Sequence, residues 1–143
     1  MERIEVGEDL GIRYRKVSEE ILSRSRNELY FQMPYLGLAL SSLSFVVTTD
    51  FSLGTDGASL VVHPKVLADL FSRDRRAVNR FFLHEVYHCL FRHIFKDPPE
   101  DERLWNLAAD MAVEFLIDDG NFRSTPFSVY SCMIFSYFTG TEN

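Results

Sequence analysis

Residues 74–95 read DRRAVNRFFLHEVYHCLFRHIF. Apolar and aromatic side chains recur in this stretch at helical spacing and cover nearly the whole circumference, which predicts a helix that is buried on most sides. The helix must end before Pro98 and Pro99, because proline cannot continue the backbone hydrogen bonds. The imidazole and carboxyl groups in this stretch are therefore expected to lie on a buried helix.

The pattern HEVYH at residues 84–88 predicts a divalent-metal site. His84 and His88 are four residues apart, so both imidazoles lie on one helical face and can reach one ion at the roughly 2.0 Å nitrogen distances that zinc prefers. Glu85 lies beside the first ligand, where it can accept a proton from water without occupying the metal. Zinc is therefore the expected ion, and Glu85 the expected general base. The alternative is a polar cluster in the core that binds no ion.

A second helix is expected at residues 101–119, with Asp101 as its cap and Gly120 as its end. A polar stripe recurs there every four residues through an otherwise apolar run, and it includes Asp110 and Glu114. A buried, unpaired carboxylate would cost several kcal/mol, so the stripe is expected to meet a metal, a cation or hydrogen-bond donors. Asp110 is the preferred third ligand. Glu114 is expected to hydrogen-bond a ligand imidazole, or to exchange roles with Asp110.

Other polar residues are interpreted as structural. His93 falls on the opposite face from His84 if the helix continues, so it is not expected to bind the metal. His63 precedes Pro64 at the end of a predicted strand. The arginines among residues 73–80 are interpreted as a solvated helix face without function, and Tyr87 and Trp105 as aromatics of the core or of a cleft wall.

The remaining sequence predicts a helix, a strand and a second, short strand. An amphipathic helix is expected at about residues 8–30, with a buried stripe that includes Leu10, Val17, Ile21 and Leu22. Residues 36–47 favour an extended segment, and residues 58–62 follow the turn signal at residues 55–57. These two extended segments are expected to form an antiparallel pair. The aromatic residues 126–138 are interpreted as a strand or an interface.

Composition limits the classes of function. The chain has 143 residues with no linker or repeat, so we expect a single domain over residues 1–143. Its formal charge of -6 makes nucleic acid an unexpected partner. No window reaches the roughly 18 apolar residues of a membrane span, and the N-terminus lacks a signal-peptide core. Cys89 and Cys132 are too few for a disulfide framework. We therefore predict a cytoplasmic protein with no membrane partner.

Three stretches carry a resemblance to a known family: residues 55–64, LHEVYHCLFRH at residues 83–93 and WNLAADMAVE at residues 105–114. They resemble the zincin-like metallopeptidase domain that precedes von Willebrand A-like domains in many bacterial proteins. The likeness covers about residues 8–121 and leaves residues 122–143 as an atypical aromatic tail. Glu114 stands where that family is expected to have asparagine.

The resemblance implies an α+β, zincin-like fold, in which a small antiparallel sheet packs on the active-site helix and a second helix carries a ligand. It implies His84, His88 and Asp110 as metal ligands, Glu85 as base, a peptide or protein substrate, and a partner such as a von Willebrand A-like domain. Two functions follow as expectations. One is a zinc-dependent metallopeptidase, and the alternative is a non-catalytic interaction module that zinc stabilises.

Overall fold

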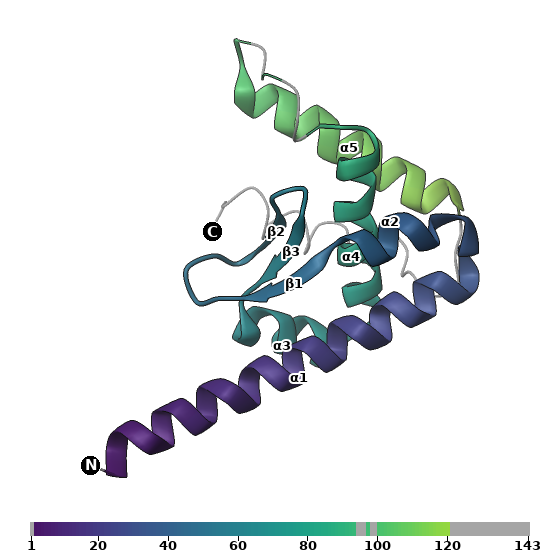
Figure 1. Ribbon diagram of the computed structural model, residues 1–143. Helices are drawn as coiled ribbons and strands as arrows, with labels where there is room; N and C mark the ends of the chain where they lie inside the picture. The colour runs from purple at the N-terminus through teal and green to yellow at the C-terminus, as the bar shows by residue number, and fades with distance from the viewer. Residues whose placement is uncertain (1, 94–96, 98–99, 121–143) are drawn as a thin grey trace.

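Helices pack against a small three-stranded sheet in the computed structural model, which describes residues 2–93, 97 and 100–120 (Figure 1). The predicted α+β class is therefore confirmed. The helices are α1 (Glu2–Gln32), the 3-10 helix η1 (Pro34–Leu36), α2 (Gly37–Ser42), α3 (Pro64–Arg73), α4 (Arg75–Leu90) and α5 (Glu102–Gly120). The strands are β1 (Ser44–Val47), β2 (Leu53–Thr55) and β3 (Ser59–Val62).

Helix α4 lies at the centre of the fold, between α1, α3, α5 and the sheet (Figure 1). Phe81, Phe82 and Leu83 are fully buried, and the Phe82 ring meets that of Phe45 on β1 edge to face. Asp74 begins the helix, because its Oδ1 atom accepts a hydrogen bond from the Arg76 backbone N–H at 2.9 Å. The prediction of a helix buried on most sides is confirmed, and the helix ends at Leu90.

Helix α1 is longer than the sequence predicts, and only part of it is packed. Ile21 and Leu22 of the predicted stripe are buried, whereas Leu10 and Val17 are exposed. Figure 1 shows that the N-terminal end of α1 extends past the rest of the described chain. The expected buried stripe was therefore wrong at Leu10 and Val17, since spacing along a helix cannot show where its packing partners lie.

The sheet is mixed, which corrects the predicted antiparallel sheet. Its strand order is β1-β3-β2, with β1 parallel to the central strand β3 and β2 antiparallel to it. The turn before β3 is tight because Asp56 Oδ1 accepts from the backbone N–H groups of Ala58 and Ser59 and Gly57 takes a positive φ of 92°. This turn joins β2 to β3, so the antiparallel partner of residues 59–62 is β2, and not the earlier segment.

Residues 36–42 were wrongly predicted as extended. Pro34 stands in the first turn of η1, and Leu36 and Leu40 are buried four residues apart, which is helical spacing. Helix α3 was not predicted at all. His63 caps it by accepting a hydrogen bond at Nδ1 from the Lys65 backbone N–H, and Pro64 is its first residue. The structure thus gives His63 the structural role that the sequence favoured.

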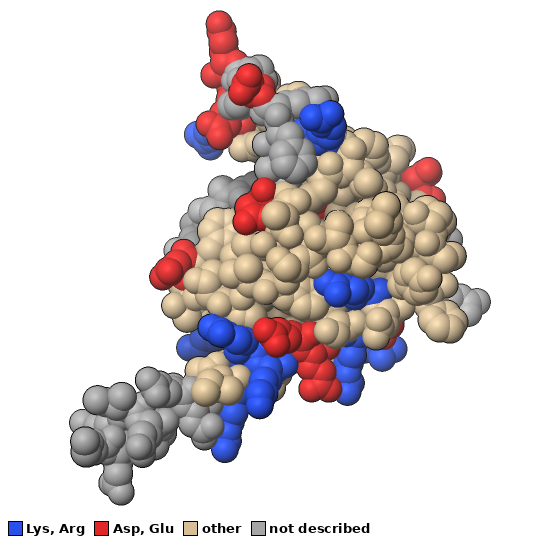
Figure 2. Space-filling model, viewed as in Figure 1, with Lys and Arg blue, Asp and Glu red and all other residues tan. Residues whose placement is uncertain are grey.

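Helix α5 follows its prediction closely. Asp101 Oδ1 accepts from the Leu104 backbone N–H at 3.0 Å, and the helix ends at Gly120. None of the described helices is long and apolar enough to cross a membrane. Residues 126–138 and Cys132 lie outside the described residues. Figure 2 shows that, on this face, charged side chains gather in the lower part of the molecule, where α1 runs, and again at its upper end, while the middle is largely uncharged.

Candidate metal centre

Three side chains from α4 and α5 converge in the interior: His84, His88 and Asp110. Asp110 Oδ1 lies 2.8 Å from His88 Nε2 and 3.3 Å from His84 Nε2, and the two Nε2 atoms are 2.8 Å apart. Both imidazoles are buried, and the Asp110 side chain is 14% exposed. The chain therefore brings two imidazole nitrogens and one carboxylate to a single point.

Two polar stripes produce this convergence. On α4 the stripe is formed by residues 80, 84 and 88, and on α5 by residues 110, 114 and 118. The contacts between the stripes run in opposite directions along the two helices: 80 with 118, 80 with 114, 84 with 114, 84 with 110 and 88 with 110. Since residues four apart share a helical face, one stripe matches the other turn by turn. Val113 and Ile117 are buried beside the α5 stripe and anchor that face in the core.

Each imidazole is oriented through its Nδ1 atom. His84 Nδ1 lies 2.7 Å from Glu114 Oε1, and His88 Nδ1 lies 3.0 Å from His93 Nδ1. A carboxylate can only accept, so the His84 Nδ1 atom donates a proton to Glu114. In each ring the Nε2 atom is then the one that faces Asp110. Glu114 is thus placed against a ring nitrogen that is turned away from the convergence point.

The cluster fits a divalent metal ion. A tetrahedral ion with ligand distances near 2.0 Å has ligand atoms about 3.3 Å apart. The observed separations of 2.8 to 3.3 Å are within about half an ångström of that value. The donor set of two imidazole nitrogens and one carboxylate oxygen is one that zinc accepts, and it leaves a fourth position for water. These three side chains could therefore hold a metal with little rearrangement.

Arg80 does not belong to a solvated face, which corrects the interpretation from the sequence. Its side chain is fully buried and forms ion pairs with Glu114 and Asp118. Arg73, Arg75 and Arg76 do lie at the surface, where each pairs with a nearby carboxylate. The sequence signal for Arg80 was its position four residues before His84, one turn along the same stripe.

His93 lies beside the cluster, which corrects its predicted place on the opposite face. That prediction required α4 to continue, but the helix ends at Leu90 and Arg92 takes a positive φ of 59°. The chain therefore turns back, so that the His93 ring meets both His88 and Trp105 edge to face. Its Nδ1 atom contacts His88 Nδ1, so it orients that ring from the side away from Asp110.

Glu85 is buried next to the cluster, with 4% of its surface exposed. Burial raises the pKa of its carboxyl group from 4.5 to about 7, while the charge of His84 lowers the pKa and that of Asp110 raises it. A carboxyl group with a pKa near neutrality can both accept and return a proton. This property suits a general base.

The charges of the cluster stabilise one another. Burial lowers the pKa of His84, but hydrogen bonds to Asp110 and Glu114, together with the charge of Glu85, raise it to about 9. Burial raises the pKa of Asp110, but hydrogen bonds to His84 and His88 lower it to about 2. Without a metal, the chain therefore holds a cationic His84 between carboxylates.

We expect the metal-free protein to lose stability as the pH rises from about 5 to about 9. The pKa of His84 is raised from 6.5 to about 9, so its contribution is complete below 6.5 and is lost as the pH rises through 9. The raised pKa of Glu85 acts in the same direction between 4.5 and about 7. The lowered pKa of Asp110 matters only in acid, where its contribution is lost as the pH falls from 3.8 to about 2.

Thermal unfolding in the presence of a chelator measures this effect. The free energy of unfolding should fall by a few kcal/mol from about pH 5 to about pH 9. A bound metal competes with the proton on His84, so the stabilisation that added zinc provides should grow over the same range. A metal-free protein whose stability is constant or rises from about pH 5 to about pH 9 would contradict the prediction.

Four further polar and aromatic residues are not among the three proposed metal ligands. Trp105 is half-buried beside His93, and Tyr87 stacks on Phe91. Asp50, which follows β1, is exposed. Sequence reasoning missed Asp118 as well as Arg80, although Asp118 stands four residues after Glu114 and thus extends the α5 stripe by one turn.

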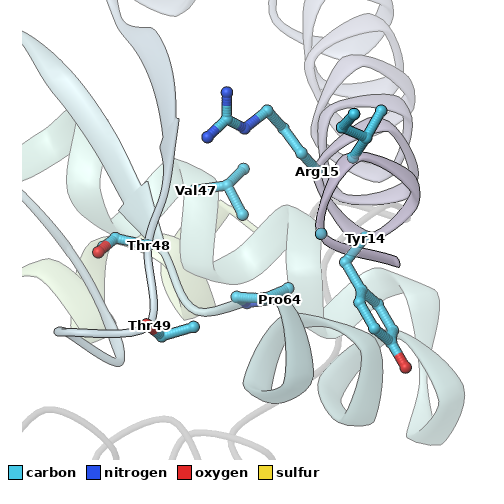
Figure 3. Close-up of a pocket in the computed structure, with 8 residues that line it drawn as sticks. Tyr14, Arg15, Val47, Thr48, Thr49 and Pro64 are labelled. Carbon is cyan, nitrogen blue, oxygen red and sulfur yellow. The ribbon is translucent and has the colours of Figure 1, made fainter. Parts of the chain in front are cut away.

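A cavity of about 550 Å³ lies elsewhere, between the N-terminal half of α1, the end of β1 and the start of α3 (Figure 3). Tyr14 and Arg15 line it from α1, and Thr48, Thr49 and Pro64 line it from the other side. None of the metal-cluster residues contributes to its wall. The cavity therefore has no direct part in chemistry at the cluster.

A family model with the description "Putative metallopeptidase domain" matches residues 18–134. This range is most of the 143-residue chain and contains all the residues of the two polar stripes. No match to the chain was found among curated proteins or among solved structures.

Proposed function

The chain belongs to this metallopeptidase-domain family, and on that premise we propose that it is a zinc-dependent peptidase in which His84, His88 and Asp110 bind the metal. The observation that carries the proposal is the convergence of their three ligand atoms. Two imidazoles favour zinc over the harder cations magnesium and calcium, which prefer oxygen ligands. The cytoplasmic location expected from the sequence stays a prediction.

The metal ligands and Glu85 have different roles in the proposed hydrolysis. When bound, zinc would supply a Lewis acid that lowers the pKa of water to about 7 and polarises the scissile carbonyl group. With the metal bound, His84 and His88 would offer Nε2 lone pairs, which requires His84 to lose the proton that it carries in the metal-free chain. Asp110 would contribute an anionic oxygen, since its pKa is already lowered to about 2. Glu85 accepts the proton that water loses as its oxygen bonds to the carbonyl carbon. It then donates a proton to the amine nitrogen as the C–N bond breaks.

The test combines metal content with hydrolysis by the full chain. We expect near-stoichiometric zinc after purification, and cleavage of casein or of a peptide library that stops on chelation and returns when zinc is added. Buffer without protein and protein with chelator throughout are the controls. A purified, folded chain that takes up no zinc would overturn the metal site, whereas zinc uptake without cleavage would leave the second function below.

The second function is a non-catalytic module in which zinc ties α4 to α5. The observation in its favour is an exposed apolar face on α5, where Leu104 and Met111 are each 61% exposed and Phe115 is 69% exposed. Such a face fits contact with another protein, for example a von Willebrand A-like domain. A large loss of thermal stability on chelation, combined with no hydrolysis by the wild type, would favour this function.

A further inference from the structure

Arg80 is the most buried charged side chain in the described part of the molecule, at 0% exposure. A buried guanidinium is stable only where carboxylates and other acceptors satisfy it. Arg80 pairs with two carboxylates on α5, and one of them, Glu114, also contacts a proposed metal ligand. The position of the cation is therefore tied to the cluster, which is one helical turn away.

The contacts divide the Glu114 carboxylate between two partners. Its Oε2 atom accepts from Arg80 Nε at 2.8 Å and, at a shorter distance, from Arg80 Nη2. Its Oε1 atom is left for His84 Nδ1 at 2.7 Å. The third guanidinium nitrogen, Nη1, donates to Asp118 Oδ1 at 2.7 Å. The planar guanidinium is thus held at both ends, and it fixes the rotation of the carboxylate.

A fixed and ionised carboxylate determines how the neighbouring ring is used. Because Glu114 can only accept, His84 Nδ1 carries the proton, and Nε2 faces Asp110 and His88. If Glu114 were free to rotate or to become protonated, neither the tautomer nor the ring angle would be set. Hydrogen-bond partners of metal-binding histidines typically change metal affinity by 10- to 100-fold when they are removed.

We infer that Arg80 is a positioning residue, which acts through Glu114 to hold His84 with Nε2 directed at the metal position. Asp118 anchors the guanidinium from its other side. This inference rests on the proposed function, in which His84 binds a metal. It goes beyond that function because it assigns a role to a residue that does not touch the metal position.

Lysine is the decisive substitution at position 80. It keeps the positive charge, but as a single point charge it cannot reproduce the two N–H bonds that converge on Oε2. In Arg80→Lys we expect zinc affinity, measured by competition with a chromophoric chelator, to fall by roughly 10-fold or more. Asp118→Asn leaves the bonds between Arg80 and Glu114 in place and should lower the affinity by less than about threefold. Unfolding in chelator shows whether each variant is folded.

A purely structural role would change the stability of the variants but not the zinc affinity of those that fold. Folded Arg80→Lys with wild-type zinc affinity would therefore overturn the inference. If Arg80 acts through Glu114, Arg80→Lys combined with Glu114→Gln should bind zinc about as weakly as Glu114→Gln alone. Losses that multiply in the double variant would overturn the inference as well.

A metal-free measurement separates this inference from the proposed function. The proton on His84 Nδ1 should give a slowly exchanging NMR signal in the wild type, because it is buried against a fixed carboxylate. The signal should exchange faster in Arg80→Lys, and should be unchanged in the surface control Arg24→Lys. If the wild type binds no zinc but the signal depends on Arg80, the proposed function is wrong, whereas the positioning of His84 by Arg80 is supported. If neither the signal nor the affinity depends on Arg80, the inference fails.

Discussion

Glu85→Gln is expected to keep zinc at the wild-type level and to lower kcat for peptide hydrolysis by roughly 100- to 10,000-fold. Glutamine has nearly the same shape as glutamate but cannot accept a proton. Glu85 lies beside His84 without belonging to the three residues that converge. The substitution should therefore remove proton transfer while the metal ligands stay in place.

The pH dependence of the wild type offers a second measure of the same group. The pKa of Glu85 in the metal-free chain is about 7, mainly because the side chain is buried. A bound metal cation nearby would lower that pKa to a value below 7. In the wild type, kcat/KM should therefore decrease in acid with an apparent pKa below 7. The residual activity of Glu85→Gln should not show this decrease.

Glu28→Gln provides the matched control. Glu28 is on α1, where its carboxylate accepts from Asn79 and pairs with Arg75, away from the cluster. The same chemical change there should leave kcat within about twofold. Equal rates for wild type and Glu85→Gln would refute Glu85 as the base. Loss of zinc from Glu85→Gln would instead show that Glu85 is needed for metal binding.

The elements that carry the cluster could be predicted because their signals are local. Periodicity placed α4 and α5, and the caps Asp74 and Asp101 behave as short-range side-chain chemistry requires. The spacing of His84 and His88 put both rings on one face. The four-residue repeat through Asp110 indicated which side of α5 would turn inward.

The features that could not be predicted depend on contacts between residues that are distant in the sequence, or on a local change in backbone direction. Arg80 follows the same four-residue spacing as the histidines, but its burial becomes evident only when Glu114 and Asp118 are placed opposite it. His93 was assigned to the wrong face because one positive φ at Arg92 reverses the chain. The parallel pairing of β1 with β3 is likewise a long-range choice, since β2 and its turn intervene in the sequence.

Asp110→Ala is expected to lower zinc affinity by more than about 100-fold, the largest loss among the carboxylate substitutions in the cluster. The reason is that Asp110 Oδ1 contacts both Nε2 atoms, so it lies where a shared ion would be bound. A residue that touches the ion should matter more than one that orients a ligand. Elemental analysis and chelator competition, applied to the same preparations, measure this affinity.

The comparison with Glu114→Ala decides between the two roles that the sequence left open. Glu114 contacts His84 at Nδ1 and not at Nε2, so its loss should reduce affinity by roughly 10- to 100-fold, which is less than the loss for Asp110. Asp119→Ala, a substitution at an exposed carboxylate on the same helix, should have no effect. If Glu114→Ala lost zinc more completely than Asp110→Ala, the two carboxylates would exchange roles. If metal content survived both Asp110→Ala and His84→Ala, the ion would be bound elsewhere, and the paired stripes of α4 and α5 would be a polar core network only.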